Sequence, residues 1–223
     1  MRYKIYPNVC HRDKVRRKSY ISYLIVSILV CFPFAGHCQL LDSLTLDTMV
    51  ACKSITAALK DTANVIKLDL SKKKLTDVPE AIRKFPNLQY LDLSKNKITE
   101  VPKWIGELKN LQFLILSKNK IDSLPPQFGD LIHLKYFIMN RGNLARLPHT
   151  IGNLKELRYI DLWDDDMSSY PFELKYISDN LRVLDLRDVL VSNASQAFLK
   201  SVLPNTTIYL SPPLRLRKIT SRI

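Results

Sequence analysis

The feature that most limits how this chain can fold is a stretch that occurs twice. Residues 88–102 read LQYLDLSKNKITEVP and residues 111–125 read LQFLILSKNKIDSLP, so the pattern returns after 23 residues. Its central apolar residue recurs at steps of 23 residues and finally 24, at Leu68, Leu91, Leu114, Phe137, Ile160 and Leu184. A period of this length is typical of repeat architectures, in which each unit buries its apolar face against its neighbours.

Prolines keep the same period of 23 residues, at Pro79, Pro102, Pro125, Pro148 and Pro171. Proline lacks the N–H that a strand ladder needs, but its fixed φ suits the first turn of a helix. Before each proline, apolar residues such as Leu91 and Leu93 alternate with the period of a strand, and after it they recur at spacings of three. Each repeat is therefore predicted to contain a strand, a loop and a short helical or 3-10 segment.

The pattern LxxLxLSxNxIxxLPxxIGxLxx, almost complete in residues 88–110 and 111–133, resembles leucine-rich repeats of the 23-residue type. Similar repeats occur in Ras-group proteins, plant disease-resistance receptors and exported bacterial leucine-rich repeat proteins. The resemblance implies an α/β fold, a curved solenoid with a parallel concave sheet and short helical or 3-10 convex segments. It also implies that Asn96 and Asn119 satisfy buried backbone groups. The aligned residues in the other copies are Lys73, Gly142, Asp165 and Val189.

The amino end reads HRDKVRRKSYISYLIVSILVCFPFAGHCQLLDS, a basic cluster followed by an apolar run of about sixteen residues. A membrane span needs about 20 residues, so residues 1–38 are predicted to be a signal peptide, with cleavage before Gln39. An uncleaved anchor formed by residues 20–36 and a lipoprotein attached at Cys38 are the alternatives. The expected location is secreted, periplasmic or at the cell surface.

Three further parts follow. Residues 39–65 are predicted to form an N-terminal cap, with a helix over residues 54–60 that begins after Ser54. Residues 66–211 are predicted to hold six repeats and a closing strand near residues 207–210, preceded by a helix over residues 194–202. Residues 212–223 form a basic tail that is expected to be disordered.

The net charge of +13 is unevenly distributed. Residues 1–38 carry +6 and the residues after Pro213 carry +4, which leaves +3 for the residues between them. A repeat body with so little excess charge does not predict nucleic-acid binding.

The sequence contains no motif for catalysis: GxxxxGK, HExxH and paired CxxC are all absent. His133 and His149 fall in different phases of the repeat and are interpreted as solvated surface residues. Cys52 is interpreted as a small buried side chain, with a disulfide to Cys38 as the alternative. The chain is therefore predicted to have no enzymatic activity, no cofactor and no metal site.

Strand residues that flank the buried ones are expected to face the concave side. Tyrosine or phenylalanine precedes the central residue in four successive repeats, isoleucine replaces the usual aspartate after it in two, and tryptophan replaces a serine in a third. Cross-strand stacking could explain the aromatic residues alone, whereas grouped apolar residues on this side indicate a contact surface. The predicted partner-binding residues are Tyr90, Phe113, Ile115, Tyr136, Ile138, Tyr159 and Trp163.

Charges beside this surface change sign along the repeats. Asp161 is expected beside Asp185, an unfavourable pairing that calls for a nearby cation. Local arginines are the preferred explanation (Arg158, Arg182 and Arg187), and a calcium site or a basic partner are the alternatives. The predicted electrostatic rim comprises Lys95, Lys118, Arg141, Asp161, Asp164, Asp185 and Asp188.

The sequence thus predicts a non-enzymatic, exported module that recognises a protein partner on its concave face. One alternative is a glycan- or peptidoglycan-binding surface protein, in which the aromatic residues would stack on sugar rings. Another is a cytosolic signalling scaffold, against which the amino terminus argues. A membrane contact is predicted only through an uncleaved N-terminal segment.

Overall fold

The structure is a computed structural model that describes residues 40–211. The predicted signal peptide or anchor and the predicted tail lie outside the described residues. The chain divides into two units, one ending at Met49 and the other beginning at Val50. The first unit contributes helix α1 (Ser43–Thr48), which begins where the side chain of Asp42 accepts a hydrogen bond from the Thr45 N–H at 2.9 Å. The sequence analysis did not predict this helix.

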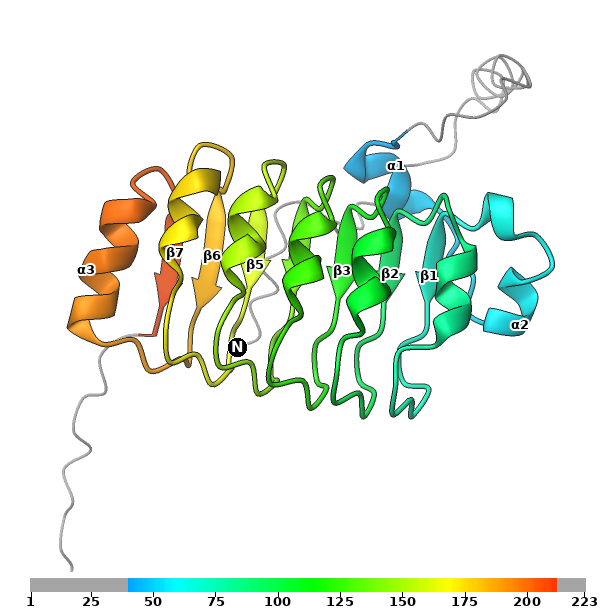
Figure 1. The fold of residues 1–223 in the computed structure, drawn as a ribbon, viewed down its shortest axis with the longest axis horizontal. Coiled ribbons are helices and arrows are strands. Elements are labelled where there is room, and N and C mark those ends of the chain that lie inside the picture. Colours follow the sequence, from blue (N-terminus) through cyan, green and yellow to red (C-terminus); the bar gives the residue numbers. More distant parts are fainter. Residues whose placement is uncertain (1–39, 212–223) are drawn as a thin grey trace, which may run out of the picture. The chain divides into compact units, whose positions relative to one another are not determined.

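The second unit is built on one parallel sheet whose seven strands follow chain order (Figure 1). The strands are β1 (Lys67–Asp69), β2 (Tyr90–Asp92), β3 (Phe113–Ile115), β4 (Tyr136–Ile138), β5 (Tyr159–Asp161), β6 (Val183–Leu186) and β7 (Thr207–Leu210). Leu91 is paired with Leu68 on one side and with Leu114 on the other. The predicted repeat register is therefore confirmed, residue by residue.

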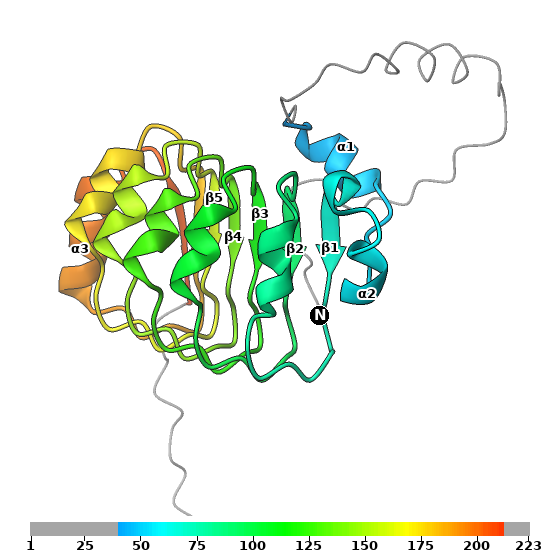
Figure 2. The same ribbon diagram turned by 45° about the vertical axis from the view of Figure 1, so that its right-hand side comes forward.

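Five 3-10 segments cover one face of this sheet (Figures 1 and 2). They are η2 (Glu80–Lys84), η3 (Lys103–Glu107), η4 (Pro126–Asp130), η5 (His149–Asn153) and η6 (Phe172–Ile177). Each begins directly after a proline of the 23-residue series, as predicted. Their hydrogen bonds link residues three apart, as from Ile105 N–H to Pro102 O at 3.0 Å, which suits apolar residues spaced by three.

Between the sheet and the 3-10 segments lies one continuous core. The middle residue of each of the first six strands is fully buried, and Phe85, Phe128 and Phe137 are its largest side chains. The glycines of the repeat let successive 3-10 segments approach closely, since a Cβ on Gly129 would lie 2.4 Å from Thr150 O. This packing defines an α/β leucine-rich repeat solenoid with the free face of the sheet as its concave side.

Both ends of the repeat series are covered. At β1, Cys52 extends the sheet by a parallel bridge to Leu68. Helix α2 (Ile55–Ala58), which is shorter than predicted, begins after Ser54 and is followed by η1 (Thr62–Asn64). At the other end, helix α3 (Asn193–Val202) leads into β7, which pairs with β6.

No helix within residues 40–211 has the length and apolar character needed to cross a bilayer. Cys52 forms no disulfide among the described residues, and its partly buried thiol donates to Ser54 O at 3.4 Å. The alternative partner, Cys38, lies outside the described residues.

Candidate functional site on the concave face

The predicted aromatic residues form a continuous column across four neighbouring strands. The ring centroids of Tyr90 and Phe113 are 5.6 Å apart, those of Phe113 and Tyr136 4.3 Å, and those of Tyr136 and Tyr159 6.3 Å. Phe113 and Tyr136 are nearly parallel, with an interplanar angle of 7°. The ammonium group of Lys67 lies 4.6 Å from the Tyr90 centroid. Ring faces in this column are therefore occupied largely by other groups of the same sheet.

The two isoleucines that replace aspartate are also neighbours. Ile115 is paired with Ile138, and the pair lies between Asp92 on β2 and Asp161 on β5. Ile115 is half-buried, whereas only 7% of Ile138 is exposed, the same fraction as for Tyr159. We call the group formed by Phe113, Ile115, Tyr136, Ile138, Tyr159 and Trp163 the apolar strip. Its accessible surface comes mainly from the four other members, because Ile138 and Tyr159 are buried, contrary to the expectation that they face a partner.

Aspartates on either side of the isoleucines brace the loops that follow the strands. The Asp92 carboxylate accepts a hydrogen bond from the Ser94 N–H at 2.7 Å, and Asp161 accepts one from the Trp163 N–H at 3.0 Å. Burial raises the pKa of both carboxyl groups, and these hydrogen bonds oppose the shift. Where isoleucine stands instead, the brace is lost, so the substitution is not explained by a need of the backbone.

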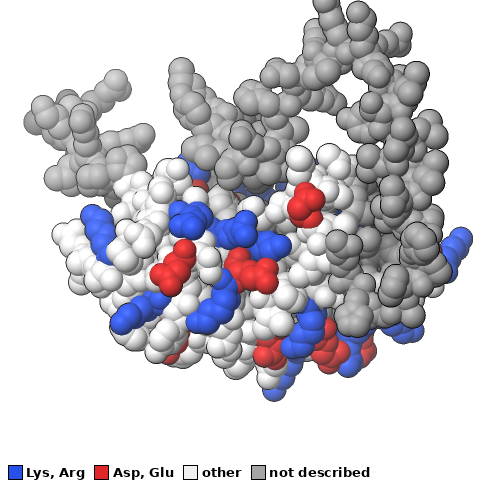
Figure 3. All heavy atoms as spheres, turned by 90° about the horizontal axis from the view of Figure 1, so that it is seen from above, with Lys and Arg blue, Asp and Glu red and all other residues white. Residues whose placement is uncertain are grey.

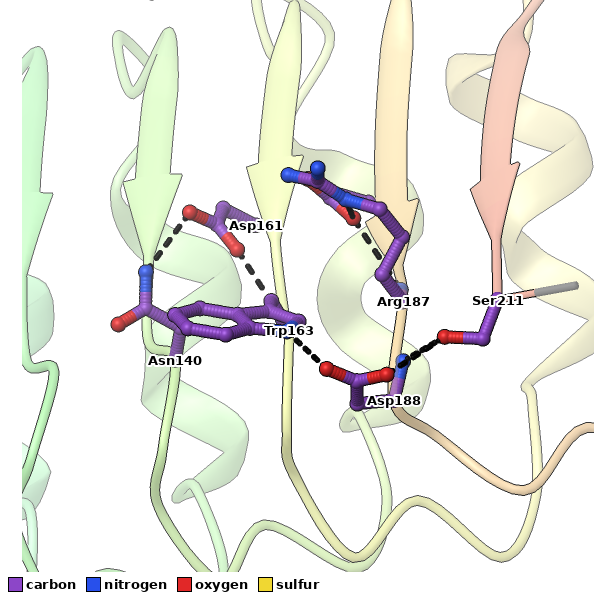
Figure 4. Close-up of polar contacts among 7 residues, drawn as sticks. Asn140, Asp161, Trp163, Arg187, Asp188 and Ser211 are labelled. Atoms are coloured by element: carbon purple, nitrogen blue, oxygen red, sulfur yellow. Dashed lines mark hydrogen bonds and ion pairs between the residues drawn. The ribbon is translucent and has the colours of Figure 1, made fainter. Parts of the chain in front are cut away.

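Trp163 is fixed in one orientation by a contact on its edge, shown in Figure 4, and by another on its face. Its indole Nε1–H donates to Asp188 Oδ2 at 2.8 Å, and the guanidinium carbon of Arg141 lies 4.2 Å from the ring centroid. Asp188 also accepts a hydrogen bond from the Ser211 hydroxyl at 2.7 Å. Hydrogen bonds from Ser211 and Trp163 lower the pKa of Asp188, so this carboxylate is held ionised. A half-buried, immobilised indole is well suited to act as a contact residue.

The predicted meeting of carboxylates occurs between Asp161 and Asp185, which are paired across β5 and β6. Arg187 offsets their repulsion, since its Nε and Nη2 atoms bind Asp185 at 2.9 and 2.6 Å, and these hydrogen bonds raise the pKa of Arg187. Asn140 Nδ2 donates to Asp161 Oδ2 at 2.8 Å (Figure 4). Of the three arginines proposed to compensate the cluster, Arg187 is the one seen to do so. Within residues 40–211 no group of three or more metal-ligating side chains converges.

Five of the predicted rim residues occupy equivalent positions in the loops that follow the strands. We call these positions the left-handed corners, after a backbone conformation that the sequence did not reveal. Their φ angles lie between 55° and 59°, in the left-handed region, at Lys95, Lys118, Arg141, Asp164 and Asp188. The N–H of such a residue donates to the next repeat, as from Lys95 to Ser117 O at 2.8 Å. The other two, Asp161 and Asp185, lie on strands. Arg141 and Asp164 approach within 3.7 Å across neighbouring corners.

The asparagines of the repeat satisfy backbone groups of two adjacent loops, as the resemblance implied. Asn96 Oδ1 accepts from the N–H groups of Lys73 and Leu75 at 2.9 and 3.1 Å, and its Nδ2 donates to Leu70 O and Leu93 O. Asn119 makes the same type of contact one repeat later, with its Oδ1 accepting from Ile98 N–H at 3.1 Å. Each amide thus links its own repeat to the preceding one.

Asp165 takes the place of this asparagine in the fifth repeat. Its Oδ1 accepts from Gly142 N–H and Leu144 N–H at 3.0 and 3.2 Å. Its Oδ2 is buried and has no hydrogen-bond partner among the described residues. Burial raises the pKa of this carboxyl group to about 7, despite the two backbone hydrogen bonds. The place of Asp165 in the repeat could be predicted from the sequence, but its raised pKa could not.

The two histidines lie apart, each paired with a glutamate one repeat further on. His133 Nδ1 lies 2.8 Å from Glu156, and the exposed His149 Nδ1 lies 2.9 Å from Glu173. The hydrogen bond to His149 lowers the pKa of Glu173. Both are surface pairs; His149 is exposed, as the sequence suggested, whereas His133 is partly buried.

A hollow of about 530 Å³ beside the 3-10 segments is lined by charged residues that satisfy one another. Arg83 lies 3.0 Å from Glu80 and 2.9 Å from Glu107. The concave face, rather than this hollow, therefore gathers the unusual residues.

Fold and site together define a repeat solenoid with an ordered apolar surface on its sheet. A family model described as a leucine-rich repeat region matches residues 46–206. The chain belongs to the leucine-rich repeat proteins. No curated protein matches it at a significant level.

Solved structures of bacterial leucine-rich repeat proteins resemble the chain. A leucine-rich repeat protein of Leptospira interrogans is 28% identical, with a TM-score of 0.59, over 73% of this chain and 47% of that one. Internalin C2 of Listeria monocytogenes is 26% identical, with a TM-score of 0.57, over 72% of this chain and 67% of that one. The chain thus spans about half the length of the Leptospira protein.

Proposed function

We propose that this leucine-rich repeat protein is a non-enzymatic, exported recognition module that binds a protein partner through its apolar strip. The observation that carries the proposal is the replacement of two loop-bracing aspartates by Ile115 and Ile138, next to an immobilised Trp163. Binding hot spots are enriched in tryptophan and tyrosine near the centre of an interface. The rim charges on either side would orient the partner more than hold it.

The packing of the rings favours a protein partner over a glycan stacked on the aromatic column. A sugar that stacks on an aromatic residue needs a free ring face. Phe113 and Tyr136 stack on each other at 4.3 Å, and Arg141 covers one face of Trp163. What the strip offers is mainly ring edges and aliphatic groups, which suit the side chains of a folded partner.

Export is supported by the amino-terminal sequence, a basic cluster before an apolar run that ends near Gly36. Both relatives with solved structures described above are bacterial proteins. The expected consequence is a mature chain that begins at Gln39.

The test begins with capture of proteins from the extracellular and envelope fractions of the source organism by the immobilised chain, followed by their identification. Affinity for each candidate is then compared between the unchanged chain and the variant Ile115→Asn/Trp163→Ser. Ile138 is left intact because it is buried and its replacement would confound folding with binding.

Loss of two contact residues should weaken binding by at least about 2 kcal/mol, roughly 30-fold in Kd. The control is the exposed convex variant Lys103→Gln, which should bind as before. A strip variant that melts normally and binds its partner unchanged would show that the site lies elsewhere.

A further inference from the structure

Loops that follow the first four strands carry two rows of cations along one edge of the solenoid. These loops lie below the arrowheads of the strands in Figure 1. One row occupies the left-handed corners and the other lies two residues further on. The rows consist of Lys72, Lys95, Lys118 and Arg141, and of Lys74, Lys97 and Lys120.

All seven side chains are exposed. Of these seven residues, only Arg141 has a carboxylate of residues 40–211 at ion-pair distance, namely Asp164 at 3.7 Å. The six lysines have none within the same residues. Like charges in neighbouring repeats repel one another. The same loops hold the exposed carboxylates Asp77, Glu100 and Asp122, so the edge carries an excess of positive charge that an anion would relieve.

The rows advance with the spacing of the strands. Lys72 N–H donates to Ser94 O at 3.0 Å, Lys95 N–H to Ser117 O at 2.8 Å and Lys118 N–H to Asn140 O at 2.9 Å. These bonds keep the corners in register, so that successive cations follow the strand spacing of about 4.8 Å. The result is an edge with regularly spaced charges over four repeats.

The backbone does not require lysine at these corners. A left-handed φ disfavours residues with a Cβ, and Gly, Asn and Asp adopt it most readily. The same corner holds Asp164 and Asp188 in the next two repeats, each with a φ of 59°, so small residues are accepted there. Four successive long cations at this position thus point to a role of their side chains.

Other parts of the surface differ in this respect. The edge on which the strands begin, seen from above in Figure 3, shows cations and carboxylates interspersed. On the convex side Arg83 is paired with both Glu80 and Glu107. Exposed lysines without an ion pair also occur elsewhere on the described surface, as at Lys84 and Lys103, so what distinguishes the two rows is their regular register with the strands.

We propose that these two rows bind a linear anionic polysaccharide, with a carboxylate or sulfate on each sugar, that runs across the first four repeats. A sugar unit advances such a chain by a length close to the strand spacing, so each repeat meets one sugar unit. An extended acidic peptide places side chains of one face about 6.7 Å apart, which does not match the rows. In the fifth repeat Asp164 and the exposed Asp166 repel the polymer and end the site. This surface borders the apolar strip, because Arg141 of the first row stacks on Trp163.

The test measures binding of the full chain to polygalacturonate at two salt concentrations, with neutral dextran as the control polymer. The variant Lys95→Gln/Lys97→Gln/Lys118→Gln is compared with Lys84→Gln/Lys103→Gln/Lys200→Gln, which removes the same charge from exposed positions on η2, η3 and α3. Both variants retain the basic termini, so any contribution from them cancels.

The edge variant should bind polygalacturonate about tenfold more weakly, whereas the control variant should stay within about twofold of the unchanged chain. Binding should also weaken as salt rises. The strip variant Ile115→Asn, which leaves Trp163 and its contact with Arg141 intact, should bind the polymer normally, which separates this proposal from the function proposed above.

Equal weakening in the two lysine variants would overturn the proposal, since it would show a response to net charge alone. The proposal is also overturned if poly-glutamate or single-stranded oligo(dT) binds the edge more tightly than polygalacturonate, with the same loss in the edge variant. Thermal melting of both variants should match the unchanged chain, because every substituted side chain is exposed.

Discussion

Asp165 Oδ1 accepts a hydrogen bond from the Leu144 N–H at 3.2 Å, the same contact that Asn96 makes with the Leu75 N–H at 3.1 Å. The two side chains differ in the second group. Asn96 has an NH₂ that donates to carbonyl oxygens, whereas Asp165 has an oxygen that lacks a partner among the described residues. A protonated Asp165 would restore the missing donor.

Stability is therefore expected to depend on the ionisation of Asp165. Its pKa rises from an ordinary value of 3.8 to about 7, so between these values the folded state holds a proton that the unfolded state releases. Stability from this group is complete below pH 3.8, falls as the pH rises to about 7, and is constant above it. The total loss is of the order of 4 kcal/mol.

Replacement of Asp165 by Asn should remove this dependence, because the amide supplies the donor at every pH. The free energy of unfolding, measured by urea titration from pH 4 to 8, should match the unchanged chain at pH 4 and exceed it at pH 8. The exposed Asp179→Asn, whose carboxylate is not among the groups that raise the pKa of Asp165, is the matched control and should have little effect at either pH. A variant at position 165 that is no more stable at pH 8 than the control would contradict the prediction.

The pairing of the buried residues at the strand centres gives a second prediction. Leu114 is fully buried between Leu91 and Phe137 of the adjacent strands, so Leu114→Ala should destabilise the fold by about 2 to 5 kcal/mol. The exposed Lys109→Ala should change stability by less than about 0.5 kcal/mol. Chemical denaturation of the two variants decides the matter, and equal midpoints would show that the register is wrong.

The buried asparagines of the repeat give a third prediction. Asn119 is buried and binds Ile98 N–H, Leu93 O and Leu116 O; because Asn96 also donates to Leu93 O, Asn119→Ala leaves two buried backbone groups, Ile98 N–H and Leu116 O, without the partner they have here. The expected cost is about 2 kcal/mol or more. The exposed Asn143→Ala is the control. A loss no larger than that of the control would mean that water replaces the amide without penalty.

The fourth prediction concerns cleavage of the signal peptide at the amino end. Cleavage by a signal peptidase should leave Gln39 as the first residue of protein recovered outside the cytoplasm. Amino-terminal sequencing of that protein checks it. Recovery of an intact Met1 on protein that stays in the cytoplasm would contradict export.

Periodic features of the fold could be predicted from the sequence because each residue type has a single structural role in every copy. Leu91 recurs as the buried centre of a strand and Pro102 as the start of a 3-10 segment, so both placements are confirmed. Helix α1 was missed because it stands outside the repeats and has only the capping Asp42 as a signal.

Contacts at the candidate site were less predictable. The indole hydrogen bond from Trp163 to Asp188 joins residues 25 apart, and its geometry depends on the loop between them. The left-handed corner at Lys95 was hidden because lysine gives no signal for that backbone conformation. Burial of Ile138 and Tyr159 to 7% depends on packing that a strand pattern cannot express.

Because Leu111 and Leu134 occupy equivalent places in successive repeats, the chain could lose residues 111–133 and rejoin Asn110 to a leucine in the same setting. Such an excision would shorten the concave face by one strand, about 4.8 Å, without a new loop. The spacing between any two contact points on this face is thus counted in whole repeats. Evolution or design could adjust its reach to a partner by copying or deleting 23-residue units.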